Sequence, residues 1–199
     1  ELEGDVSSQY VTGLLFALPL LDGDSEIRML SKLESKPYVD LTIACLRHFG
    51  IAVQETEQGY AVAGGQQYHA CDLTVEGDYS QAAFFCVANA LGSDITLTNL
   101  NPESVQGDKK IVEIVREMCY NREQGLPAGF TVDAADIPDL VPILAVLATF
   151  GTAPSSITGA HRLAIKESDR LASTADLLNR LGGKVTATPD GLEIEPVEQ

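Results

Sequence analysis

The sequence predicts an α/β fold made of repeated β-α-β-α-β-β units, with the helices inside and the sheets outside. The first observation is a repeated tripeptide, because Glu3-Gly4-Asp5 before one expected helix has a counterpart in Glu76-Gly77-Asp78 before another. The second is that strand and helix signals recur in three passes of about 60 to 70 residues, a period typical of repeat architectures. The third is that the expected helices are apolar over a broad face, which favours their burial.

The first pass covers residues 1–74, and its two expected helices start at residues suited to that position. Ser7 or Ser8 can cap the first helix, because a serine oxygen accepts from backbone N–H groups left free at a helix start. Pro37 suits the first turn of the second helix, where a missing N–H costs nothing. The expected buried face of this second helix is Leu41, Ala44, Cys45 and Phe49. The expected elements are helices over 7–21 and 34–50, a strand over 25–30 and a hairpin formed by 52–56 and 60–63.

The two later passes repeat this order, and the second is shortened. In the second pass we expect strands over 73–75 and 95–100, helices over 83–91 and 108–118, and a turn over 121–125. In the third we expect strands over 130–132 and 156–158, helices over 136–150 and 166–181, and a hairpin formed by 184–188 and 192–195. The repeat places a crossing between two domains near 66–71.

The composition is that of a globular protein and argues against several classes of partner. The 199 residues carry a formal net charge of −16, which disfavours binding to nucleic acid or to an anionic membrane. The longest apolar stretch, 137–150, is too short to span a bilayer and contains Asp139. We therefore expect a protein that binds neither nucleic acid nor membrane.

The four cysteines have neither the spacing of a metal site nor the density of a disulfide framework. Cys45 and Cys86 fall in apolar helical runs, so we expect them to be buried thiols. Cysteine usage of this kind agrees with a reducing cytoplasm, where we expect the protein to be located.

The stretch Lys166-Glu167-Ser168-Asp169-Arg170 places two cations and two acids at the start of an expected helix. Lys166 and Arg170 are four residues apart, roughly on one helix face. Cations there oppose the positive end of the helix dipole, but a bound anion would make the arrangement favourable. A solvated, salt-bridged first turn is the alternative, and for this stretch alone it is the more common outcome.

Three other expected helix starts carry polar clusters: Ser7-Ser8-Gln9, Ser35-Lys36-Pro37-Tyr38 and Asp136-Ile137-Pro138-Asp139. Each has a purely structural interpretation, because serines cap helices, a tyrosine can simply pack, and an acid suits a first turn. Together with the cations, they present hydroxyls and a carboxylate at helix N-termini. This combination favours a phosphorylated, hydroxylated small molecule as ligand.

Five stretches occur in the order found in one known enzyme family: Val6-Ser7-Ser8-Gln9-Tyr10, Glu34-Ser35-Lys36-Pro37-Tyr38-Val39-Asp40-Leu41-Thr42, Val75-Glu76-Gly77-Asp78, Asp136-Ile137-Pro138-Asp139 and Ile165-Lys166-Glu167-Ser168-Asp169-Arg170. On these residues the chain resembles the enolpyruvyl transferases of the shikimate pathway. The resemblance implies two lobes of three units each. Residues 1–74 would be the last unit of the first lobe, and residues 75–199 two units of the second, whose third unit is absent.

The resemblance also implies a reaction. The 5-hydroxyl of shikimate 3-phosphate adds to phosphoenolpyruvate, and phosphate is then eliminated to leave the enolpyruvyl ether. These two anionic small molecules would be the partners of an enzyme that is a monomer when complete. No metal and no organic cofactor is implied.

The family's residue roles carry over to the matching positions as expectations. Ser7, Ser8 and Ser35 would hold the shikimate phosphate, Gln9 would reach both substrates, and Tyr38 would line the shikimate pocket. Asp139 would accept the proton of the attacking hydroxyl, and Lys166 would help to place that hydroxyl. Glu167 would transfer a proton at the enolpyruvyl carbon, and Arg170 would bind phosphoenolpyruvate. The motif around Arg162 does not match cleanly, so its contact with phosphoshikimate stays open.

Several segments that the family needs are not in these 199 residues, among them a Lys-Ser-x-x-x-Arg segment, a Gly-rich loop with an arginine, and a later Asp-His-Arg. We therefore interpret the chain as an internal fragment and expect it to be inactive by itself; steady phosphate release above background would contradict this. The alternative is a non-catalytic binding or scaffold piece, or a degenerate homologue.

Overall fold

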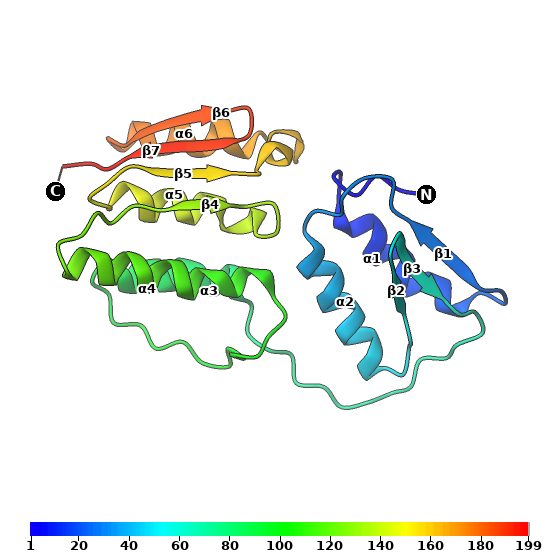
Figure 1. Cartoon of the computed structure of the whole chain (residues 1–199). Coiled ribbons are helices and arrows are strands. Elements are labelled where there is room, and N and C mark those ends of the chain that lie inside the picture. The colour runs from blue at the N-terminus through cyan, green and yellow to red at the C-terminus, as the bar shows by residue number, and fades with distance from the viewer. Residues whose placement is uncertain (199) are drawn as a thin grey trace. The chain divides into compact units, whose positions relative to one another are not determined.

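The computed structural model describes residues 1–198, and the chain forms two compact units (Figure 1). Unit 1 comprises Glu1–Val75 with Val105–Gly107, and unit 2 comprises Glu76–Ser104 with Asp108–Gln199. The assignment of residues 1–74 and 75–199 to two lobes of a larger architecture stays a prediction.

Unit 1 contains two helices and an antiparallel sheet in the order β1-β3-β2. Its elements are α1 (Ser8–Ala17), the 3-10 helix η1 (Leu18–Leu20), β1 (Ser25–Arg28), α2 (Lys36–His48), β2 (Gln54–Thr56) and β3 (Gly59–Val62). A parallel bridge joins Leu2, before α1, to Met29, which follows β1. The order of helices and strands predicted for the first pass is therefore confirmed.

The core of unit 1 lies between the helix pair and one face of the sheet. It contains Val11 and Leu15 of α1, Val39 and Leu46 of α2, and Ile27, Tyr60 and Val62 of the strands. The hydroxyls of Thr12 and Thr42 lie 3.2 Å apart and join the two helices within this packing.

The buried face expected for α2 was wrong. The buried positions are Val39, Thr42 and Leu46, whereas Leu41 is 36% exposed and Cys45 only half-buried. Apolar residues occur on several sides of this helix, so two different stripes have helical spacing. Periodicity alone does not decide which of them packs against the sheet.

Unit 2 has four helices and a four-stranded sheet in the order β4-β5-β7-β6. Its elements are α3 (Tyr79–Ala90), α4 (Lys110–Glu123), β4 (Thr131–Asp133), the 3-10 helix η3 (Pro138–Leu140), α5 (Val141–Thr149), β5 (Ser155–Thr158), the 3-10 helix η4 (His161–Ile165), α6 (Arg170–Arg180), β6 (Lys184–Thr188) and β7 (Gly191–Glu195). A short 3-10 helix, η2 (Gly107–Lys109), precedes α4. The strands β4 and β5 are parallel, and the other pairs are antiparallel.

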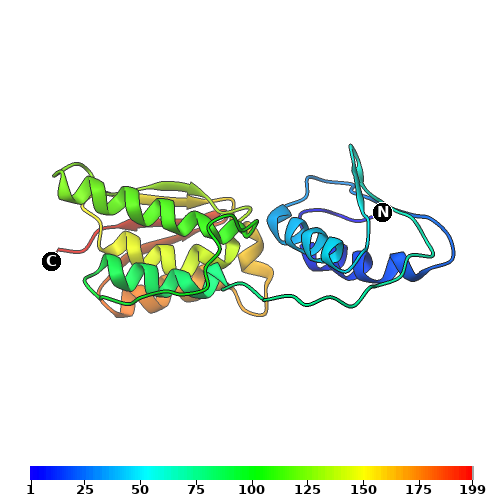
Figure 2. The same cartoon turned by 90° about the horizontal axis from the view of Figure 1, so that it is seen from below.

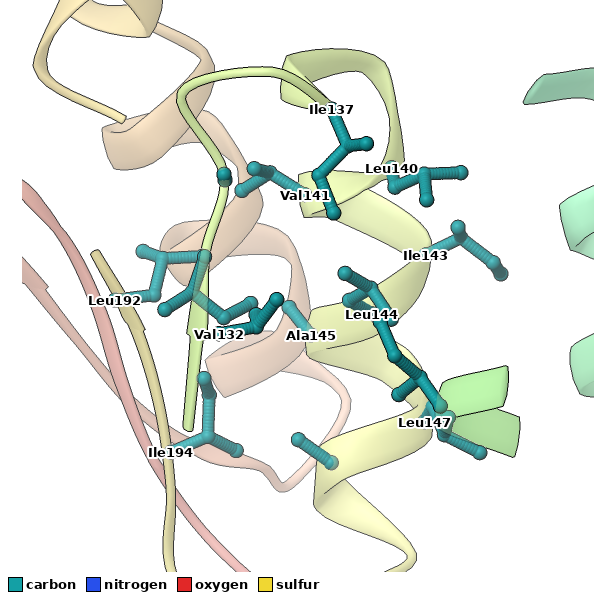
Figure 3. Packing of buried hydrophobic residues seen from close by; sticks show 14 of the residues in the cluster. Val132, Ile137, Leu140, Val141, Ile143, Leu144, Ala145, Leu147, Leu192 and Ile194 are labelled. Carbon is teal, nitrogen blue, oxygen red and sulfur yellow. The ribbon is translucent and has the colours of Figure 1, made fainter. Parts of the chain in front are cut away.

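Helix α5 is the centre of unit 2. It packs on the sheet through β5 and β7 and touches both α3 and α6 (Figures 1 and 2). Nearly all of its side chains are buried in one cluster with inward-facing residues of the sheet such as Val132 and Ile194. Ala145 lies on the side of α5 toward Val132, and Leu144 and Leu147 lie on the side away from it (Figure 3). The other face of the sheet is polar, with Ser156 donating to Glu193 at 2.8 Å. Helices thus lie on the inner face of the sheet, as predicted.

Four local predictions in the second pass were wrong. Residues 73–75 and 95–100 are irregular rather than strands, although the Gly77 N–H donates to the carbonyl of Asn99 at 2.7 Å. Leu73 is 42% exposed and Ile95 38% exposed, so neither is buried against a sheet. The expected turn over 121–125 is mostly helix, because α4 continues through Glu123. Cys86, on α3, is half-buried rather than buried.

Membrane insertion through a helix has no structural basis in residues 1–198, because none of their helices is long and apolar enough to cross a bilayer.

Candidate functional site

Arg170 joins two of the predicted catalytic carboxylates in unit 2. Its Nη1 donates to Oδ1 of Asp139 at 3.0 Å, and its Nη2 donates to Oε2 of Glu167 at 3.1 Å. Asp139 belongs to η3, and Arg170 is the first residue of α6. Asp169 caps that helix by accepting from the Ala172 N–H at 2.9 Å, which fixes where the helix begins. Local capping and tertiary packing together bring the three charges to one place.

The two carboxylates differ in their surroundings. The Glu167 side chain is 82% exposed and the Asp139 side chain 46% exposed. A hydrogen bond from its own backbone N–H lowers the pKa of Glu167, and the Arg170 guanidinium and the nearby Lys166 charge lower it further. Glu167 is therefore ionised at neutral pH and can accept a proton, while Arg170 holds its orientation.

Lys166 does not share a helix face with Arg170, so that part of the prediction was wrong. It follows η4 in extended backbone conformation, and α6 begins four residues later. The capping aspartate, rather than the apolar periodicity, sets the helix start. Lys166 is half-buried and makes no hydrogen bond or ion pair within residues 1–198. Its ammonium is thus available to an anion beside Glu167.

Arg162 is a buried residue that binds the segment leading to Asp139. It is 3% exposed, lies in η4 and donates from Nη2 to the carbonyl of Ala135 at 2.8 Å. The N–H of Ala135 in turn donates to Asp133 at the end of β4. Arg162 thereby connects η4 to the segment that leads into η3 and Asp139. Sequence reasoning could not assign this role, because nothing in the local pattern indicates that an arginine is buried.

The N-termini of α1 and α2 lie at the same end of unit 1. The N–H of Glu34, before α2, donates to the carbonyl of Gly4, before α1, at 3.1 Å. The Gly4 N–H donates to the Ser31 hydroxyl, and a Cβ at this glycine would collide with the carbonyl of Lys32. This close approach of two backbones requires glycine at position 4. It brings the serines at the two helix starts into one neighbourhood.

The serines at the start of α1 have different surroundings. Ser7 caps the helix, its oxygen accepting from the Gln9 N–H at 3.3 Å, as its structural interpretation predicts. A capping serine oxygen still carries its own hydrogen, so Ser7 retains a donor. Ser8 is buried, and Gln9 is exposed.

Ser35 is the residue that precedes α2, and Tyr38 lies in the first turn of this helix. Ser35 is 3% exposed, and its backbone is left-handed, with φ 56° and ψ 33°. Its side chain makes no capping bond, and its carbonyl accepts from the Tyr38 N–H at 3.1 Å. Tyr38 is half-buried.

Lys36, which the sequence placed in a polar cluster without a role of its own, forms ion pairs with two carboxylates in this unit. Its Nζ donates to Asp40 at 2.6 Å and lies 3.3 Å from a Glu55 carboxylate oxygen. Burial lowers the pKa of Lys36, but its hydrogen bonds to Asp40 and Glu55 outweigh burial and leave the pKa above its ordinary value.

Within the described residues, no group of three or more His, Cys, Asp or Glu side chains is arranged to hold a metal ion. The structure thus offers two sets of polar groups: hydroxyls and amides at two helix starts in unit 1, and cations with carboxylates in unit 2. Each set suits an anionic, hydroxylated ligand.

Comparison with known proteins gives one consistent match. A sequence model of the family described as EPSP synthase (3-phosphoshikimate 1-carboxyvinyltransferase) matches residues 1–199. A 3-phosphoshikimate 1-carboxyvinyltransferase of Clostridium kluyveri is 44% identical over 99% of this chain and 49% of its own length. One of Clostridium beijerinckii is 41% identical over 100% of this chain and 48% of its own length.

The solved structures agree in fold. An EPSP synthase structure from Acinetobacter baumannii superimposes with a TM-score of 0.73, at 23% identity, over 97% of this chain and 47% of the other. The chain thus spans about half the length of the relatives and the structure that it matches. The enolpyruvyl-transferase type of α/β architecture predicted from the sequence is confirmed by this likeness.

Proposed function

Because the chain belongs to the EPSP synthase family, we propose that its residues serve the transfer of the enolpyruvyl group from phosphoenolpyruvate to the 5-hydroxyl of shikimate 3-phosphate. Inorganic phosphate is the second product. Both substrates are anions, and the relatives' name describes a transfer of this kind. We still expect the 199 residues alone to be catalytically inactive.

The observation that carries this proposal is the pair of hydrogen bonds from Arg170 to Asp139 and Glu167. Adding a hydroxyl across an enol double bond requires a base at the hydroxyl and an acid at the methylene carbon. Two carboxylates held by one guanidinium, with different exposure, supply two groups for these tasks.

In the addition step, the 5-hydroxyl oxygen forms a bond to carbon 2 of phosphoenolpyruvate and loses its proton to Asp139. The methylene carbon gains a proton from Glu167 and becomes a methyl group. Glu167 is ionised at neutral pH, so it must first take up that proton. In the elimination step, the bond from carbon 2 to the phosphate oxygen breaks, and the methyl group returns its proton to Glu167. The departing phosphate takes up the proton held by Asp139.

The cations act on charge rather than on protons. Lys166, with no ion-pair partner in the described chain, orients the 5-hydroxyl and stabilises the oxyanion that forms there. Arg170 binds an anionic group of phosphoenolpyruvate. To do so, its guanidinium must exchange at least one of its present carboxylate partners for the substrate.

The shikimate phosphate is assigned to unit 1. Ser7, Ser8 and Ser35 offer hydroxyls at the starts of two helices, where the positive end of the helix dipole favours a phosphate. Gln9 reaches both substrates, and the half-buried Tyr38 lines the ring. These groups attract the phosphate locally, although the chain as a whole carries a charge of −16.

Calorimetric titration of the purified chain with shikimate 3-phosphate tests the proposal. We expect saturable binding, weakened at least about ten-fold by Ser35→Ala, a loss of roughly 1.4 kcal/mol. Ser173→Ala, at an exposed serine of α6, is the matched control and should bind as the unaltered chain does. No binding by the folded chain, or equal binding by Ser35→Ala, would contradict the assignment and favour a non-catalytic piece.

A further inference from the structure

We propose that Lys36 is a positioning residue for Ser35, acting through Asp40 and Glu55 rather than by contact with the bound phosphate. The inference rests on the proposed function, because it takes from there the assignment of Ser35 to the phosphate. The ion-pair cluster of Lys36, Asp40 and Glu55 has no role in the proposed function, and this inference gives it one.

The backbone of Ser35 needs support that other helix starts in this chain do not need. Ser7, Asp78 and Asp169 each precede a helix in extended conformation and cap it with their own side chain. Ser35 is left-handed at φ 56°, a region that residues with a Cβ rarely adopt, and its side chain makes no capping bond. A residue in such a conformation persists only when its surroundings hold it there.

Lys36 is the next residue, and its side chain is tied at two points. One tie runs to Asp40, one turn along α2, at 2.6 Å; the other runs to Glu55 of β2 at 3.3 Å. Glu55 is paired in the sheet register with the buried Tyr60 of β3, although its own side chain is 58% exposed. The first residue of α2 is thereby fixed both to its own helix and to the sheet, and with it the peptide that follows Ser35.

Helix stability does not explain a lysine at this position. A cation in the first turn opposes the helix dipole, and lysine four residues before an acid is the less favourable orientation of such a pair. The tie to Glu55 crosses from helix to sheet and adds nothing to an isolated helix. The cluster therefore serves the tertiary placement of the helix start.

A direct contact with phosphate would work against the same cluster. Two carboxylates already surround the ammonium, and moving it to a phosphate would leave Asp40 and Glu55 side by side without their cation. The geometry thus separates two tasks: Ser35 meets the ligand, and Lys36 keeps Ser35 in place.

The decisive variant is Glu55→Gln, because the two possible roles of Lys36 predict opposite changes in the affinity for shikimate 3-phosphate. If Lys36 acts on the phosphate by its charge, removing Glu55 leaves more positive charge near the site and strengthens binding. If Lys36 positions Ser35 through Glu55, the same change loosens the helix start and weakens binding. The matched control is Glu26→Gln, which removes an exposed, ion-paired glutamate from β1 of the same unit.

The readout is the Kd for shikimate 3-phosphate of the whole chain, with the thermal midpoint measured beside it. We expect Glu55→Gln and Lys36→Met each to raise Kd at least about five-fold, a loss of roughly 1 kcal/mol. The double variant should have a Kd little higher than that of either single variant, because both changes break the same ion pair between Lys36 and Glu55. Glu26→Gln should leave Kd within about two-fold. Tighter binding by Glu55→Gln, or unchanged Kd with a lowered midpoint, would overturn the inference.

A second measurement separates this inference from the proposed function. The backbone NMR chemical shifts of Ser35, and the exchange rate of the Tyr38 amide that donates to its carbonyl, report the left-handed turn without ligand. Both should change in Lys36→Met and in Glu55→Gln but not in Glu26→Gln. If the unaltered chain binds no shikimate 3-phosphate, the proposed function fails, and these shifts still decide whether Lys36 holds Ser35. Unchanged shifts would refute the positioning role.

Discussion

Nη1 of Arg170 lies 3.0 Å from Oδ1 of Asp139. The residue expected to bind phosphoenolpyruvate therefore contacts the residue expected to act as the base, without substrate. Arg170 also holds Glu167 at 3.1 Å. An anion that recruits this guanidinium weakens its hold on the two carboxylates. The order of binding and proton transfer can therefore be coupled through one side chain.

Replacing Arg170 by methionine should raise the pKa of Glu167 toward its ordinary value of 4.5, because one hydrogen bond and one nearby positive charge are removed. The bond from the backbone N–H of Glu167 remains, so the pKa should not reach that value. Carbon-13 NMR titration of the glutamate carboxyls measures it. Arg180→Met is the control, since Arg180 pairs with Asp176 on the same helix. An unchanged Glu167 pKa would show that Arg170 does not hold this carboxylate in solution.

The same pair makes a prediction about acid stability. The folded-state pKa of Glu167 lies below its unfolded value, so its contribution is fully present above pH 4.5 and is lost as the pH falls through the folded pKa. The contribution is small, because Glu167 is exposed to solvent. Arg170→Met should therefore lower the midpoint slightly at pH 7 and not at pH 2 in thermal unfolding. An equal loss at both pH values would point to packing instead.

We expect the buried Tyr60 to lower the free energy of unfolding at alkaline pH. Burial raises its pKa to about 12, above the ordinary value of 10.0, so the folded state disfavours the phenolate. Its contribution is intact below pH 10 and decreases as the pH rises toward 12, by on the order of 2 kcal/mol. Urea unfolding of Tyr60→Phe at pH 8 and pH 11 should show a smaller alkaline loss than the unaltered chain. Identical alkaline losses would place the sensitivity elsewhere.

Gly191 should not tolerate a side chain. It starts β7, and an added Cβ would collide with the carbonyl of Ile157 on the neighbouring β5. We expect Gly191→Ala to reduce the free energy of unfolding by about 2 kcal/mol or more, because backbone atoms must move. Gly13→Ala is the control: nothing lies near its Cβ in α1, and it should stabilise by about 0.5–1 kcal/mol. Urea denaturation measures the free energy of unfolding of both variants. Similar changes in the two would contradict the close packing of Gly191 against Ile157.

The helix starts could be predicted from sequence because their causes are local. Ser7 caps α1 with its own oxygen, and Pro37 stands in the first turn of α2, as expected. The same locality explains one error. Asp169 rather than Lys166 decides where α6 begins, because its side chain accepts from the Ala172 N–H.

Tertiary choices could not be predicted in the same way. Val39 and Leu41 stand on different faces of α2, both with apolar neighbours at helical spacing, and only packing against the sheet selects Val39. Residues 73–75 have strand-forming composition, yet strands require partners with matching register, and they are irregular. The buried Arg162 and the ties of Lys36 likewise depend on contacts between segments distant in sequence.

Phosphate release by a chimera tests the central claim most directly. In it, this chain replaces the matching 49% of the Clostridium kluyveri relative. We expect release of phosphate from phosphoenolpyruvate only when shikimate 3-phosphate is present, and a loss of at least about 100-fold in kcat on Asp139→Asn, because a general base is removed. A folded chimera that releases no phosphate, or one in which Asp139→Asn is fully active, would contradict the account.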